Sequence, residues 1–162
     1  MNLRTLGVAL MLVVLLALHF TLRPLLDWRA GVDFVVIATL VVAVRARPGV
    51  AAIVGFALGL AIDAMSPTAL GAGTLAMTLV GFSASRLKAA FFADDVLLNA
   101  IFVFVGKAMF DVIYLLAEGR LGGMALLWQL LLWTPLASLA TAIVGLVVLG
   151  LMRPSLEQRR MM

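Results

Sequence analysis

Four polar residues interrupt one long apolar segment at the spacing of a helix face. If this segment crosses a membrane, it places charged side chains inside the bilayer. Lys107 is followed by Asp111, Tyr114 and Glu118, at intervals of four, three and four residues. On a helix this spacing places all four on one face, where Lys107 and Asp111 can form an ion pair that lowers the cost of both charges. Charges within a membrane are often functional. The pair could therefore serve a proton relay or a partner, or it could simply fix the packing of a helix bundle.

A second constellation combines glycines with a carboxylate. Gly55, Gly59 and Asp63 are four residues apart and share one helix face, and Gly71 follows after a short turn. Glycines let another helix approach closely, and Asp63 adds a polar anchor at the helix end. This face could receive a partner helix, or it could pack against a neighbouring helix of the same chain with Asp63 capping the turn.

The next apolar segment carries a stripe of small, weakly polar residues. Thr74, Thr78, Gly81 and Ser85 again recur every three or four residues. We expect this stripe to pack against the preceding helix, its partner in a hairpin.

The remaining inventory argues against an enzyme. The chain has no cysteine and one histidine, His19, which we expect near a membrane interface rather than at a metal. It has no HExxH motif, phosphate-binding loop or Ser–His–Asp arrangement. We therefore expect neither catalysis nor a bound cofactor or metal.

Composition indicates an integral membrane protein. Hydrophobic residues make up 65% of the chain, its mean hydropathy is +1.20, and Lys, Arg, Asp and Glu together make up only 12%. So few charges could not cover a water-exposed surface. The net charge of +4 could suggest nucleic acid, but the basic residues lie in short segments beside apolar runs, which is typical of topology signals.

The apolar runs predict an all-α bundle of six transmembrane helices in a single domain, 1–162, since one span takes about 20 residues. The second span has a short apolar part, so we expect Asp27, Trp28, Arg29 and Asp33 in the headgroup region. We expect Arg23-Pro24 to end the first helix, Pro48 to begin the third and Pro135 to kink the sixth. The predicted spans are about 5–22, 26–44, 49–65, 69–88, 95–118 and 124–152.

Positive charge predicts the orientation. With the N-terminus inside, eight Lys and Arg residues lie in inner segments and three in outer loops. This bias predicts that both termini are cytoplasmic and that Asp63 lies near the outer face.

One segment resembles a known family. Gly55-Phe-Ala-Leu-Gly-Leu-Ala-Ile-Asp63, followed by Ser66-Pro67, Leu70-Gly71 and an apolar helix containing Gly81, is similar to the most recognisable segment of the MreD family of bacterial rod-shape-determining membrane proteins. The number of spans, the short loops and the basic C-terminal tail match as well. The motif itself covers about residues 55–86.

The resemblance implies a function in cell elongation and peptidoglycan synthesis at the inner membrane. MreD proteins are non-enzymatic and associate with MreC, which links them to RodA, a penicillin-binding transpeptidase and MreB. On this basis we expect the transmembrane helix of MreC to pack on the face of Gly55 and Gly59. The family is also similar in fold to the substrate-binding subunits of energy-coupling-factor transporters, so a small-molecule-binding transporter subunit is the alternative.

Overall fold

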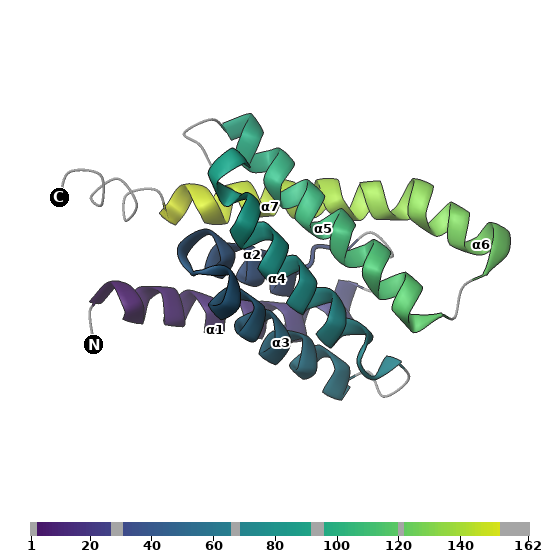
Figure 1. Ribbon diagram of the computed structural model, residues 1–162, viewed down its shortest axis with the longest axis horizontal. Helices are drawn as coiled ribbons and strands as arrows, with labels where there is room; N and C mark the ends of the chain where they lie inside the picture. The colour runs from purple at the N-terminus through teal and green to yellow at the C-terminus, as the bar shows by residue number, and fades with distance from the viewer. Residues whose placement is uncertain (1–2, 27–30, 66–68, 92–95, 120–121, 153–162) are drawn as a thin grey trace.

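The computed structural model describes residues 3–26, 31–65, 69–91, 96–119 and 122–152, and these residues are almost entirely helical (Figure 1). The all-α fold predicted from the sequence is confirmed. The helices are α1 (Leu3–Leu26), α2 (Phe34–Arg45), α3 (Pro48–Met65), α4 (Ala72–Phe91), α5 (Val96–Glu118), α6 (Gly123–Trp128), the π-helical turn η2 (Gln129–Trp133) and α7 (Thr134–Met152).

Two predictions about the first two helices are wrong. Helix α1 continues through Arg23-Pro24 and ends at Leu26, which was expected to begin the second span. A proline so near the end of a helix removes only one backbone hydrogen bond, so the last turn persists. Helix α2 begins at Phe34 and has 12 residues, or about 18 Å, too short to cross a membrane alone. The expected headgroup residues Asp27, Trp28 and Arg29 lie outside the described residues.

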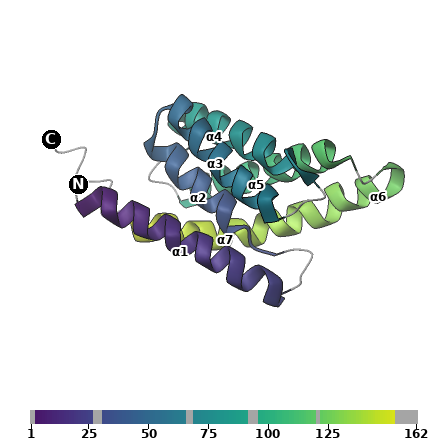
Figure 2. The same cartoon turned by 90° about the horizontal axis from the view of Figure 1, so that it is seen from below.

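Helix α2 is the centre of the bundle. It is apolar all round, and eight of its 12 residues are buried. It contacts α1, α3, α4, α5 and α7. Figure 2 shows α2 between α1 on one side and the α3–α4 hairpin on the other. A helix surrounded in this way determines the positions of all its neighbours.

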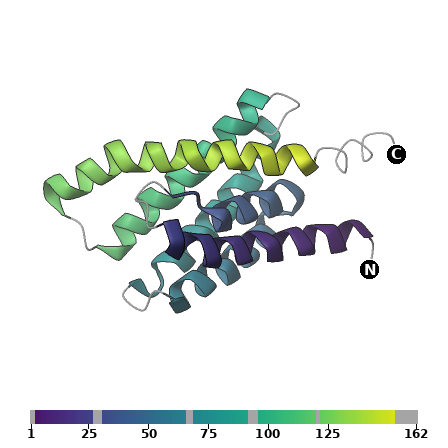
Figure 3. The ribbon, with the colours of Figure 1, turned by 180° about the vertical axis from the view of Figure 1, so that it is seen from behind.

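The hairpin of α3 and α4 forms the most extensive helix pair, and α5 packs between α4 and α7. Pro48 occupies the first position of α3 as predicted, where its missing N–H costs nothing. The expected Ser66-Pro67 turn lies outside the described residues. In Figure 3 the start of α1 at Leu3 and the end of α7 at Met152 lie at the same end of the bundle. We call the opposite end, which holds Asp63, the far end.

The segment α6–η2–α7 runs as one helix and projects past α5 at the far end (Figure 1). Its α-helical hydrogen-bond pattern changes to a π-helical turn at Gln129–Trp133, just before Pro135, where a kink was expected. The N–H of Thr134 donates to the carbonyl of Gln129, five residues earlier. A proline ring would collide with the carbonyl four residues before it, and the wider π turn relieves that collision.

Three helical segments within the described residues are long and apolar enough to cross a membrane: Pro48–Met65, Val96–Glu118 and Gly123–Gly150. Shorter apolar helices are Leu10–Thr21 and Phe34–Arg45. Many large apolar side chains on the outside of the bundle are exposed, among them Ile53 and Phe56 on α3 and Leu139 and Ile143 on α7. In a bilayer such faces contact lipid, as expected for an all-α membrane protein.

Candidate functional site

The glycine face of α3 is filled by α4. A Cβ atom added at Gly59 would stand 2.5 Å from the carbonyl oxygen of Gly73, and one at Gly55 would collide with the carbonyl oxygen of Met77. The contact is reciprocal, because a Cβ at Gly81 of α4 would stand 2.5 Å from the carbonyl oxygen of Ala51. Of the two alternatives for this face, the structure therefore shows packing against a neighbouring helix of the same chain. The expectation that a partner helix packs on this face is wrong, since no space remains there.

Asp63 caps α4 from the end of α3. Its carboxylate is 1% exposed and accepts hydrogen bonds from the backbone N–H groups of Gly71, Gly73 and Thr74, at 3.0, 2.9 and 2.8 Å. The Thr74 hydroxyl donates a fourth, at 2.5 Å. The N–H groups of Gly73 and Thr74 belong to the first turn of α4, and Gly71 directly precedes it. The N–H groups of this turn have no helical acceptors of their own and carry the positive end of the helix dipole. The buried charge is thereby compensated.

Gly71 makes this cap possible. Its φ of +94° lies in the region that residues with a side chain rarely adopt. In this conformation its N–H points at Asp63 while its carbonyl accepts from the N–H of Leu75, at 2.9 Å. The four residues Gly55, Gly59, Asp63 and Gly71 thus form one unit that closes the α3–α4 hairpin.

The polar stripe of α4 continues the same interface. Thr78 donates to the carbonyl of Thr74 at 2.6 Å, and Ser85 donates to the carbonyl of Ala46 at 2.8 Å. Lys88 reaches the same carbonyl at 2.8 Å. A Cβ atom at Gly59 would stand 2.6 Å from Cα of Thr74, and one at Gly55 would stand 3.3 Å from Cα of Thr78, so the predicted packing of this stripe against the preceding helix is confirmed. Ser85 and Lys88 extend the contact to the turn between α2 and α3.

We expect Asp63→Asn to lower the free energy of unfolding by about 1.5–3 kcal/mol, the usual worth of hydrogen bonds to a charged group. The amide keeps one acceptor oxygen but turns an NH2 group toward N–H donors. Thr74→Ala removes a single hydroxyl donor and should cost less. SDS titration of the purified protein in mixed micelles measures both. Equal stability of Asp63→Asn and the wild type would show that the cap contributes nothing.

Lys107 binds two carboxylates in the middle of the bundle. Its ammonium group is 2.6 Å from Asp111 Oδ1 and 3.2 Å from Asp33 Oδ2, and Lys107 is only 6% exposed. The predicted pair of Lys107 and Asp111 is present. Tyr114, one turn further along α5, stacks on Phe110 with ring centroids 5.6 Å apart.

The placement of Asp33 in the headgroup region is wrong, because Asp33 is 5% exposed and belongs to this cluster. It is the N-cap of α2, with Oδ1 accepting from the N–H of Val36 at 3.3 Å. Lys107 lies midway along α5, so α2 begins near the middle of the bundle rather than at its surface. The sequence signal was an aspartate directly before an apolar run.

Two further helices reach Asp33. The hydroxyl of Thr141 on α7 accepts a hydrogen bond from the backbone N–H of Asp33 at 3.2 Å. On α1, Nδ1 of His19 lies 3.6 Å from Oδ1 of Asp33. His19 is 2% exposed and contacts Asp33 in the middle of the bundle, so its predicted interfacial position is also wrong. The charged cluster of Asp33, Lys107 and Asp111 therefore connects α2 and α5, with His19 adding α1 and Thr141 adding α7.

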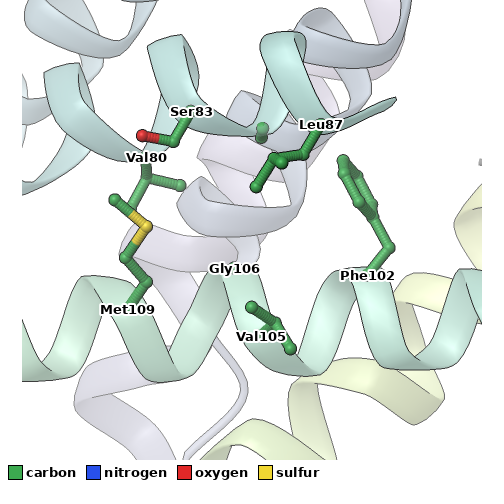
Figure 4. Close-up of a pocket in the computed structure, with 8 residues that line it drawn as sticks. Val80, Ser83, Leu87, Phe102, Val105, Gly106 and Met109 are labelled. Carbon is green, nitrogen blue, oxygen red and sulfur yellow. The ribbon is translucent and has the colours of Figure 1, made fainter. Parts of the chain in front are cut away.

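A small apolar cavity lies between α4 and α5 (Figure 4). Its volume is about 30 Å³, and its lining includes Val80, Leu87, Phe102 and Met109, with Ser83 supplying a hydroxyl. A space of this size holds one water-sized or methyl-sized group, whereas pockets for organic ligands are typically several hundred Å³. This cavity does not fit a vitamin-sized ligand.

Comparisons with protein-family models, curated proteins and solved structures gave no match to this chain. Functional inference therefore depends on the residues themselves.

Proposed function

We propose that the chain is a non-enzymatic membrane scaffold of the bacterial cell-elongation machinery that binds MreC. The observation that carries the proposal is the hairpin unit of Gly55, Gly59, Asp63 and Gly71. These are the residues on which the resemblance to MreD depends, and here they act together in one buried interface. A motif whose residues cooperate physically supports a family resemblance better than one scattered over the fold.

The distribution of polar groups supports a structural role. Asp63 and Lys107 are buried in contacts that join helices to one another. The lateral faces carry exposed apolar side chains, such as Phe56 on α3 and Leu139 on α7. Through such faces a bundle in a membrane can pack against the helix of a single-pass protein.

We further propose six passes through the cytoplasmic membrane with both termini in the cytoplasm. The excess of Lys and Arg in the inner segments supports this orientation. The start of α1 and the end of α7 lie at one end of the bundle, which supports an even number of passes. The far end then faces the periplasm, where MreC has its soluble domain. RodA, the transpeptidase and MreB would be reached through MreC.

Affinity purification in mild detergent, followed by identification of the retained proteins, tests this function. We expect a single-pass MreC homologue in an amount comparable to the tagged chain. Retention of an ATPase coupling module without MreC would contradict the proposal and favour the alternative of a small-molecule-binding transporter subunit.

A further inference from the structure

The cavity between α4 and α5 opens on the lateral surface of the bundle, and we call it the notch (Figure 4). Val80 and Phe102 in its lining are buried, whereas Leu87 and Val105 are 47% and 44% exposed and form its rim. Apart from the hydroxyl of Ser83, the lining side chains are apolar, so a water molecule there would lack the polar partners that hold buried water. In a bilayer the notch therefore faces hydrocarbon chains.

The notch extends from the middle of the bundle toward the end that holds Leu3 and Met152, which we call the near end. Helix α5 runs from the near end to the far end with Lys107 at its middle, and Phe102 lies about 8 Å from Lys107 on the near side. Figure 4 shows Phe102 beside Leu87 at one end of the notch, with Val80 and Met109 at the other. The notch thus lies within the membrane leaflet at the near end.

Arg86 of α4 lies at the headgroup level of the same leaflet. Helix α2 begins in the middle of the bundle beside Asp33, and its 12 residues extend about 18 Å, more than the roughly 15 Å from the bilayer centre to the headgroups. Ala46 at its end accepts hydrogen bonds from Ser85 and Lys88, both at 2.8 Å. Arg86 stands between these two donors in the sequence and is therefore at the same depth.

The side chain of Arg86 is exposed and flanks the notch. It comes directly before Leu87 and three residues after Ser83, two residues of the notch lining. Its guanidinium carbon lies 5.3 Å from the centre of the Phe82 ring, which is 40% exposed on the lateral surface. Arg86 forms no ion pair with any described residue, and the described carboxylates lie in the middle of the bundle or at its far end. The guanidinium is available to an anion from the membrane.

The near end as a whole is basic. In the sequence, the segments predicted at this end contain eight Lys and Arg residues and only three Asp and Glu residues. Basic pockets between membrane helices attract the phosphates of anionic lipids, and each basic residue near such a surface adds to the attraction. Charge at the near end therefore complements an anionic headgroup, while the notch complements an apolar chain.

We propose that the notch and Arg86 form a binding site for an anionic phospholipid. The phosphate accepts hydrogen bonds from the guanidinium of Arg86, and one acyl chain runs along α4 and α5 with a methylene-sized segment in the notch. The notch volume of about 30 Å³ suits such a segment. The positions proposed above for contact with MreC lie on α3 and α7, so this lipid site does not depend on the proposed function.

Native mass spectrometry of the full chain, released from detergent micelles, tests the site. The probes are phosphatidylglycerol and phosphatidylethanolamine with the same acyl chains, added at equal concentrations. Arg86→Gln removes the contact with the phosphate. Arg47→Gln is the matched control, because it removes the same charge at the same end from an exposed position between α2 and α3 that does not line the notch. Each variant is first required to elute as a folded monodisperse species.

We expect the wild type and Arg47→Gln to bind phosphatidylglycerol more tightly than phosphatidylethanolamine. Arg86→Gln should lose affinity for phosphatidylglycerol roughly fivefold, the usual contribution of one basic residue near an anionic headgroup. Ser83→Leu keeps Arg86 but fills the notch, and it should weaken the binding of both lipids because the acyl chain loses its place.

Equal binding of the two lipids by the wild type, or equal affinities of Arg86→Gln and Arg47→Gln for phosphatidylglycerol, would overturn the proposal. Unchanged lipid binding by Ser83→Leu would also contradict it, because the notch would then have no part in the site. If Ser83→Leu instead abolished a dimer or the retention of another protein while lipid binding stayed the same, a protein rather than a lipid would occupy the notch.

Discussion

Replacing Lys107 by methionine is expected to lower the free energy of unfolding by about 3–5 kcal/mol, as is usual when one partner of a buried ion pair is removed. The ammonium group is the cation between Asp33 and Asp111, at 3.2 and 2.6 Å. Without it the two carboxylates would face each other in the middle of the bundle. Because Asp33 also caps α2 and contacts α7, the loss should loosen the contacts of the central helix.

The matched control neutralises the whole network. In the triple variant Lys107→Met, Asp33→Asn, Asp111→Asn no charge is left without a partner, and asparagine remains a good N-cap for α2. We expect the triple variant to regain most of the lost stability in SDS titrations. If Lys107→Met alone were as stable as the wild type, the cluster would not hold the bundle together.

Gly59→Leu is expected to have a similarly large effect, of about 3 kcal/mol or more, because overpacking here meets backbone rather than flexible side chains. A Cβ at this position would already stand 2.5 Å from the carbonyl oxygen of Gly73 and 2.6 Å from Cα of Thr74. The added side chain would separate α3 from α4 and move the donors of the first turn of α4 away from Asp63.

Gly49→Leu is the control for the same substitution in the same helix. Nothing lies within 4 Å of a Cβ at Gly49, so this variant should keep its midpoint of thermal unfolding in detergent. A Gly59→Leu protein that unfolds at the temperature of the Gly49→Leu protein would refute the close packing of α3 on α4.

The α3–α4 hairpin could be predicted from the sequence because its determinants are local. Gly55, Gly59 and Asp63 repeat on one helix face, and their contacts lie within the next helix of the chain. The regular spacing of Thr74, Thr78 and Ser85 likewise indicated the face that α4 presents. What spacing could not decide was whether a partner or α4 would fill the glycine face.

The charged cluster could be predicted only in part. Lys107 and Asp111 are one helical turn apart and were recognisable as a pair. Asp33 is 74 residues from Lys107 and 108 from Thr141, and no local pattern reports contacts at such separations. The missing information was the length of α2. Because α2 begins in the middle of the bundle, its N-cap Asp33 lies in the interior, and His19 contacts Asp33 there.

Site-specific photo-crosslinking in growing cells tests the central claim, that the lateral faces of this bundle bind MreC, most directly. A photoreactive amino acid is placed at Phe56 of α3 or at Leu139 of α7, which are 50% and 55% exposed, and at Met77, which is fully buried, as the control. We predict a crosslink to MreC from at least one exposed position and none from Met77. Crosslinks from a wider scan of the exposed residues that never include MreC, in cells that contain it, would contradict the account.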